Sequence, residues 1–246
     1  MTRLSWAATG ERFYETGVDR GVLYVGLEPG VAWTGLISVS ETPTGGEPRP
    51  FYQDGIKYLN LAAAEEFAAT INAFSAPKEF APCDGISSVQ NGLFATQQPR
   101  KAFGLSYRTN IGNDVDGQNH GYKIHLVYNA LAGPSERTNA TMGAEVQPTT
   151  LTWQITTLPP SLTGRKPTAH FVIDSRYALP SLLIDVEDIL YGNETSEARL
   201  PTVSELVDMF ANPVFDPGAP TETPSYTYDG GSPSSIQTIT LDGGAP

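Results

Sequence analysis

The sequence contains a single cysteine, Cys83, which excludes an internal disulfide. No apolar run approaches the ~20 residues that a helix needs to cross a membrane. The first 17 residues also lack an apolar core of signal-peptide length. We therefore expect neither a disulfide-stapled secreted domain nor a membrane partner.

Basic residues are also scarce, above all towards the C-terminal end. The 246 residues include 15 Lys and Arg against 27 Asp and Glu, a formal charge of −12. Residues 173–246 hold 12 of the acids but 2 of the bases, whereas residues 1–172 are nearly balanced. Binding to nucleic-acid phosphates depends on Lys and Arg that displace counterions. This distribution therefore argues against a DNA-binding protein.

Turn-forming residues, by contrast, are plentiful, with 24 Gly and 20 Pro, while charged residues make up only 17% of the chain. Alternating and β-branched stretches recur between them. Strands are predicted at 22–27, 31–40, 56–61, 66–74, 104–108, 121–129, 151–157 and 169–174. Turn residues stand at 43–46, 53–55 and 113–117. The pattern predicts a mainly β fold, an antiparallel β-sandwich or barrel.

The stretch 121–129 alternates strictly, as a half-buried strand does. Its apolar side, which we expect to face the core, consists of Tyr122, Ile124, Leu126 and Tyr128. Its other side, which we expect to face water, includes Lys123, His125 and Asn129.

Two short helices are predicted late in the chain, at about 180–191 and 203–211. Pro180 stands near the start of the first helix and Gly192 stands where it stops. Thr202 and Glu205 form a capping box at the start of the second. We place these helices in one domain, residues 1–212. The Pro-, Gly- and Ser-rich extension 213–246 could be an ordered arm, through a strand at 235–241, or a loose tail.

Candidate metal ligands are few. The three histidines, His120, His125 and His170, are too scattered in the sequence to indicate a zinc site. Asp114 and Asp116 resemble the start of a calcium loop, but His125 stands where its bidentate Glu should be. We therefore predict no metal ligands.

Nucleophiles and acid–base pairs are no more convincing. The stretch from Gly104 to Arg108 begins like a nucleophile elbow with Ser106 as its nucleophile, but the closing glycine is missing. Asp185 and Asp188 share a helix face that we expect to be solvated. Cys83 has no basic neighbour that would favour a thiolate. The sequence predicts no enzyme, no catalytic residue and no cofactor.

Aromatic residues in predicted loops are candidates for contacts with other molecules. They are Phe51, Tyr52, Tyr58, Phe80, Phe94 and Phe103. Long strand edges that stay uncovered also promote association. We therefore expect the protein to assemble with itself.

Four stretches of the sequence are distinctive. They are GVAWTGLISVSETPTGGEPRPFYQDGIKYLNLAAAEEFAATINAFSAPKEFAPCDG, QQPRKAFGLSYRTNIGNDVDGQNHGYKIHLVYNALAGPSERTNAT, KPTAHFVIDS and DILYGNETSEARLPT. In this order they resemble the major tail tube proteins (major tail proteins) of long, non-contractile-tailed bacteriophages, the siphophages. The likeness runs from about Tyr14 to Phe210, and the segment after Pro213 departs from it.

This resemblance implies a β-sandwich subunit that forms six-membered rings, in which strands of every subunit join an inner β-barrel. The rings would stack into the tail tube, the conduit through which the genome is ejected into the host. It also implies a place in the virion tail, with assembly in the host cytoplasm, and tape measure and tail terminator proteins as partners. DNA would pass through the lumen without specific binding.

Members of this family use a long loop between strands to contact the neighbouring ring, and segment 41–55 matches that loop best. The contact residues that the resemblance implies are Glu41, Pro43, Gly45, Gly46, Glu47, Arg49, Phe51, Tyr52 and Asp54.

Two other classes of function stay open at this point. Another virion component, such as a tail terminator or a head decoration protein, would form a single ring or a shell array. A carbohydrate-binding β-sandwich module would be a monomer with an exposed aromatic patch.

Overall fold

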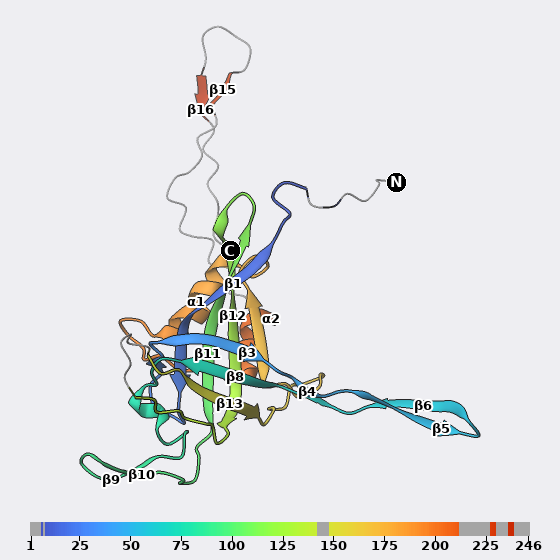
Figure 1. Ribbon diagram of the computed structural model, residues 1–246. Coiled ribbons are helices and arrows are strands. Elements are labelled where there is room, and N and C mark those ends of the chain that lie inside the picture. The colour runs from blue at the N-terminus through green and yellow to red at the C-terminus, as the bar shows by residue number, and fades with distance from the viewer. Residues whose placement is uncertain (1–5, 7, 142–147, 212–226, 230–235, 239–246) are drawn as a thin grey trace. The chain divides into compact units, whose positions relative to one another are not determined.

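A computed structural model describes residue 6, residues 8–141 and 148–211, and the backbone of residues 227–229 and 236–238 (Figure 1). The chain divides into two compact units, Met1–Pro213 and Val214–Pro246. In the first unit, antiparallel sheet and two helices confirm the predicted mainly β class. Among the described helices, none has the length and apolar character required to span a bilayer.

The second unit contains one pair of short strands within its described backbone. They are β15 (Thr227–Asp229) and β16 (Ile236–Thr238), which pair antiparallel. The other residues of the 213–246 extension lie outside the described residues. Whether this extension is an ordered arm therefore stays a prediction.

The first unit is built on one curved antiparallel sheet in the order β2-β1-β11-β12-β13-β8-β3, with β14 also paired to β12. Its strands are β1 (Tyr14–Tyr24), β2 (Val31–Ala32), β3 (Leu36–Glu41), β8 (Ala68–Ala73), β11 (Phe103–Asn113), β12 (Gly117–Ala132), β13 (Leu151–Thr157) and β14 (His170–Asp174). The long strand β12 pairs with β14 along 123–127 and with β13 along 130–132. Asn129, with a φ of 49°, lies between these stretches, so the strand changes partner there.

Two cores lie on opposite faces of this sheet. One is aromatic: Trp33, Phe80 and Trp153 contact one another with ring centroids 4.8–5.7 Å apart. On the other face, helices α1 (Pro180–Tyr191) and α2 (Val203–Ala211) cover β12 and β14 (Figure 1). Phe80 and Phe103 are buried in the aromatic core, so their prediction as contact residues in loops is wrong.

Strand β12 is buried on both faces at its centre, which corrects the expectation of a wet side. Ile124 and Leu126 face the helices, as predicted for the apolar side. Val127 and His125, on the other side, are 0% and 7% exposed. Alternation indicates which residues share a face, but it cannot show that a second layer covers the more polar face.

The predicted strand 31–40 is interrupted by a turn. It separates β2 from β3 at Gly35, whose φ of 88° favours glycine. The predicted turn at 113–117 is confirmed between β11 and β12. There the Asn113 side chain accepts hydrogen bonds from the backbone N–H groups of Val115 and Asp116.

A buried polar contact joins the sheet to α1. The Tyr24 hydroxyl donates to the Leu190 carbonyl at 2.8 Å and lies 3.1 Å from the Ser106 hydroxyl. Ser106 is fully buried, so it is a core residue and not an exposed nucleophile.

We expect Tyr24→Phe to lower the free energy of unfolding by about 1–3 kcal/mol, because it leaves the Ser106 hydroxyl and the Leu190 carbonyl buried without this partner. Urea denaturation measures the change. The double variant Tyr24→Phe/Ser106→Ala should cost less than the sum of the two single variants, since it removes both partners of the contact. Strict additivity would show that the two hydroxyls do not interact.

Candidate functional site

A long outgrowth follows β3, and we call its residues 44–66 the arm. At its base β4 (Thr44–Gly45) pairs with β7 (Glu65–Glu66), and beyond it β5 (Pro48–Gln53) pairs with β6 (Ile56–Ala62). Asp54 and Gly55 close the tip with φ values of 50° and 77°, as in a type I′ hairpin turn. In Figure 1, β5 and β6 extend away from the sheet.

This arrangement corrects two predictions. Segment 41–55 is not a loop: it contains β4, β5 and the tip of the arm, and β6 and β7 are the strands that pair with β5 and β4. Residues 43–46 do not reverse the chain, because β4 pairs with β7 and continues towards β5. Gly45, at a φ of 79°, is required here, since a Cβ would lie 2.4 Å from the Ala64 carbonyl oxygen.

Most of the predicted contact residues do come together. Those on the arm or directly before it are Pro43, Gly45, Gly46, Glu47, Arg49, Phe51, Tyr52 and Asp54. Glu41 does not join them, because it ends β3 and its side chain contacts His125 and His170 instead.

The arm carries an uncovered apolar face. Every residue of β5 and β6 is exposed. Phe51 pairs with Leu59, and Arg49 pairs with Leu61, so these four side chains share one face. Phe51, Leu59 and Leu61 are 51%, 45% and 54% exposed. A two-stranded hairpin is marginally stable alone, so this face is suited to pack against a partner.

Leu59 and Leu61 were not among the predicted contact residues. The sequence signal was the alternation of 56–61, which we interpreted as a strand of the body. Only the pairing of this strand with β5 places the two leucines beside Phe51.

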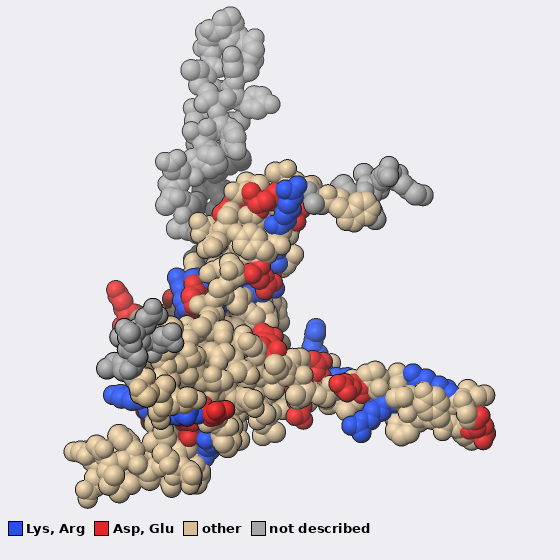
Figure 2. Space-filling view, in the orientation of Figure 1, with Lys and Arg blue, Asp and Glu red and all other residues tan. Residues whose placement is uncertain are grey.

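A second exposed hairpin lies elsewhere in the first unit. Its strands are β9 (Ser87–Gln90) and β10 (Leu93–Ala95), and residues 86–99 contain no charge. Figure 2 shows this region as an uncharged surface at the lower left, whereas the arm carries charges of both signs. Val89, Leu93 and Phe94 are 59%, 57% and 59% exposed. Phe94 is therefore exposed and available for contacts, although it lies on β10 and not in a loop as predicted.

Strand edges offer a further kind of contact. Within the described part of the chain, β14 pairs only with β12. Val172 of β14 is 47% exposed. Unpaired edges of this kind can accept a strand from another molecule.

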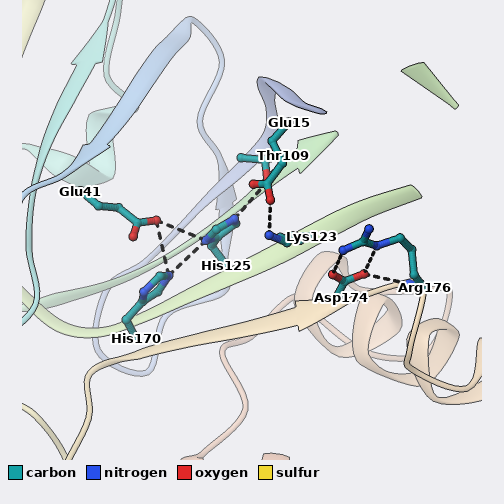
Figure 3. A network of polar contacts seen from close by, with 8 residues as sticks. All are labelled: Glu15, Glu41, Thr109, Lys123, His125, His170, Asp174 and Arg176. Atoms are coloured by element: carbon teal, nitrogen blue, oxygen red, sulfur yellow. Dashed lines mark hydrogen bonds and ion pairs between the residues drawn. The ribbon is translucent and has the colours of Figure 1, made fainter. Parts of the chain in front are cut away.

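Two of the three histidines meet in the folded chain. The Nδ1 atom of His125 lies 3.1 Å from Nε2 of His170, and Glu41 Oε1 lies 3.5 Å and 3.9 Å from these two atoms (Figure 3). The spacing of the histidines in the sequence indicated no zinc site, and the fold nevertheless brings this pair together. His120 lies apart from it, 2.9 Å from Asp116.

Burial keeps the histidine pair neutral. Desolvation, with a smaller contribution from the charge of His170, lowers the pKa of His125 to about 4, and the charge of Glu41 opposes this shift. Desolvation also lowers the pKa of His170, and Glu41 again opposes it. No sequence spacing indicated this pair, because only the pairing of β12 with β14 joins the two histidines.

The remaining candidates have ordinary structural surroundings. Cys83 is fully buried, and burial raises the pKa of its thiol to about 11, so the thiol is protonated at neutral pH. Asp185 and Asp188 are exposed on α1, as predicted.

Comparison with protein-family models gives no match, and comparison with curated proteins gives none either. Among solved structures, a chain from the baseplate of the anti-feeding prophage is 11% identical, with a TM-score of 0.35, over 69% of this chain and 97% of that chain. A chain from the tube-terminating cap of the same particle is 10% identical, with a TM-score of 0.31, over 71% and 97%. A chain from the sheath–tube complex of an extracellular contractile injection system is 12% identical, with a TM-score of 0.30, over 70% and 94%. Likenesses this distant carry no argument about this chain.

Proposed function

We propose that this protein is a structural subunit that assembles with itself, and specifically the major tail tube protein of a long, non-contractile phage tail. Six copies would close into a ring, and rings would stack into the tube through which the genome is ejected. The protein would perform no reaction. Its place would be the virion tail, after assembly in the host cytoplasm.

The arm is the observation that carries this proposal. Phe51, Leu59 and Leu61 form an apolar face on a hairpin in which every strand residue is exposed. Soluble monomers rarely leave such a segment without a partner, since it contributes little to their own core. We propose that a copy of the protein in the next ring covers this face. This agrees with the resemblance of segment 41–55 to the loop through which tail tube proteins contact the neighbouring ring.

Lateral contacts would use the strand edges. In the proposed ring, unpaired main-chain groups of β14 would bond to a neighbouring copy, and ring closure would leave no lateral edge free. Permanent interfaces of this kind commonly bury more than ~2,000 Å². The scarcity of Lys and Arg supports a tube whose inner wall does not bind DNA phosphates, so that DNA can pass through the lumen.

The size and form of the purified protein test this proposal. We expect mass photometry to detect particles in multiples of six subunits of 26.4 kDa each, and negative-stain electron microscopy to show stacked rings. Monomers at every concentration would contradict self-assembly and favour a carbohydrate-binding module. Single rings that never stack would contradict the tube subunit and favour a tail terminator.

A further inference from the structure

Three strands bring their side chains together at the root of the arm. Glu41 is the last residue of β3, three residues before the arm begins, while His125 comes from β12 and His170 from β14 (Figure 3). Phe67, directly after the arm, packs on the His170 ring with centroids 4.3 Å apart. The cluster therefore joins both ends of the arm to the sheet.

From this geometry we propose that Glu41, His125 and His170 bind one divalent transition-metal ion of the zinc type. Zinc holds nitrogen and oxygen ligands at ~2.0–2.1 Å in a tetrahedron, so neighbouring ligand atoms lie roughly 3.3 Å apart. The three distances in this cluster are 3.1, 3.5 and 3.9 Å. These separations differ from the tetrahedral value by at most about 0.6 Å, so small movements of the side chains would bring the three atoms onto one ion.

The chemistry of the three ligands selects the class of metal. Two imidazole nitrogens and one carboxylate oxygen suit zinc and its first-row neighbours, whereas calcium and magnesium prefer six or more oxygen ligands. Three protein ligands leave the fourth position to water. The protonated, buried Cys83 belongs to the aromatic core and is not part of this cluster.

Outer groups already orient the ligands. The Thr109 hydroxyl lies 3.1 Å from Nε2 of His125, the ring nitrogen that faces away from the cluster. The Tyr107 hydroxyl donates to Glu41 Oε1 at 3.0 Å, and the Tyr107 ring stacks on His125 with an interplanar angle of 5°. Metal-bound histidines usually have such a partner on their second nitrogen, because it sets the tautomer and the ring orientation.

An access route to the cluster also agrees with binding. A groove of about 830 Å³ along residues 62–67 of the arm base reaches His170. Two cations lie nearby: Lys166 lines this groove, and Lys123 next to the cluster is paired with Glu15 (Figure 3).

A bound ion would fix the arm to the sheet. Without metal, one neutral imidazole can donate to the other across 3.1 Å, so the cluster stays together. The ion adds a link between β3, β12 and β14 at the point where the arm leaves the body. Metal binding would not depend on tube formation, since all three ligands belong to one chain.

The test uses the full chain without a polyhistidine tag, treated with a chelator and then titrated with Zn²⁺. We expect calorimetry to show one ion bound per chain, Zn²⁺ to raise the melting temperature, and Mg²⁺ to do neither. Co²⁺ should give the visible absorption of a tetrahedral site. Absence of zinc binding at one ion per chain would overturn the proposal.

Matched variants locate the site. Glu41→Gln should abolish binding while its amide oxygen still accepts from Tyr107, and the 41% exposure of the Glu41 side chain favours a normal fold. Thr109→Val should weaken binding about 10–100-fold through His125. His120→Gln, outside the cluster, should bind as the parent does. Equal binding by Glu41→Gln and the parent, or loss of binding in His120→Gln, would overturn the assignment.

Discussion

Removal of the outer arm should leave a folded protein that no longer polymerises. The variant replaces Pro48–Ala62 by Asn-Gly, a two-residue hairpin turn, so β4 and β7 stay paired. Because every removed strand residue is exposed, the free energy of unfolding of the body should hardly change. Electron microscopy should show no stacked rings at concentrations where the parent forms them.

Single substitutions should show whether assembly depends on the apolar face of the arm and not merely on the presence of the arm. Leu59→Ser removes an apolar side chain opposite Phe51, and burial of a leucine side chain in an interface contributes about 2 kcal/mol. The concentration needed for assembly should then rise roughly 30-fold. Asn60→Ser, on the other face of the same strand, is the matched control and should assemble as the parent does. Normal tubes from the truncated protein, or equal effects of the two substitutions, would refute the role of this face.

Acid should destabilise the subunit through its histidine pair. The pKa of His125 is about 4 in the folded chain and close to 6.5 when the chain unfolds, so between these values the unfolded state binds more protons. Stability that is present above pH 6.5 is therefore lost as the pH falls towards 4. For His125 alone, the free energy of unfolding should fall by roughly 3 kcal/mol between pH 6.5 and 4, because each pH unit in this range costs up to about 1.4 kcal/mol.

The measurement is urea denaturation of the arm-truncated protein with a chelator, at several pH values from 7.5 to 4.5. Carboxyl groups with a lowered pKa, such as Asp19 and Asp174, reduce stability mainly below about pH 4, so they contribute little to the upper part of this range. The double variant His125→Gln/His170→Gln should lose most of the slope between pH 6.5 and 5, whereas His120→Gln should keep it. The same slope in all three proteins would exclude the buried pair as its cause.

Much of the local structure could be predicted because it depends on near neighbours. The alternation of 151–157 predicted β13, and the residues at 53–55 predicted a turn, which the structure places at the tip of the arm. Pro180 and the Thr202–Glu205 capping box marked the two helices, and the Glu205 backbone N–H does donate to the Thr202 hydroxyl. The short strands β9 and β10 had no comparable pattern, so the second hairpin was not predicted.

The candidate site was only partly predictable. Segment 41–55 included Phe51 and Tyr52, but Leu59 and Leu61 were assigned to the body because an exposed strand and a half-buried strand can have the same alternation. Glu41 was grouped with the arm because it is close to it in sequence. Its side chain instead contacts residues 84 and 129 positions further along the chain.

By itself, the sequence determined the class of the fold, the positions of the helices and most strands, and the scarcity of positive charge. Each of these follows from composition or from a period of two to four residues. Only the tertiary structure decided that His125 is buried, that it meets His170 and Glu41, and that β5 and β6 form an uncovered arm. These features depend on which distant strands pair and which faces are covered, and such long-range pairings leave no regular spacing in the chain.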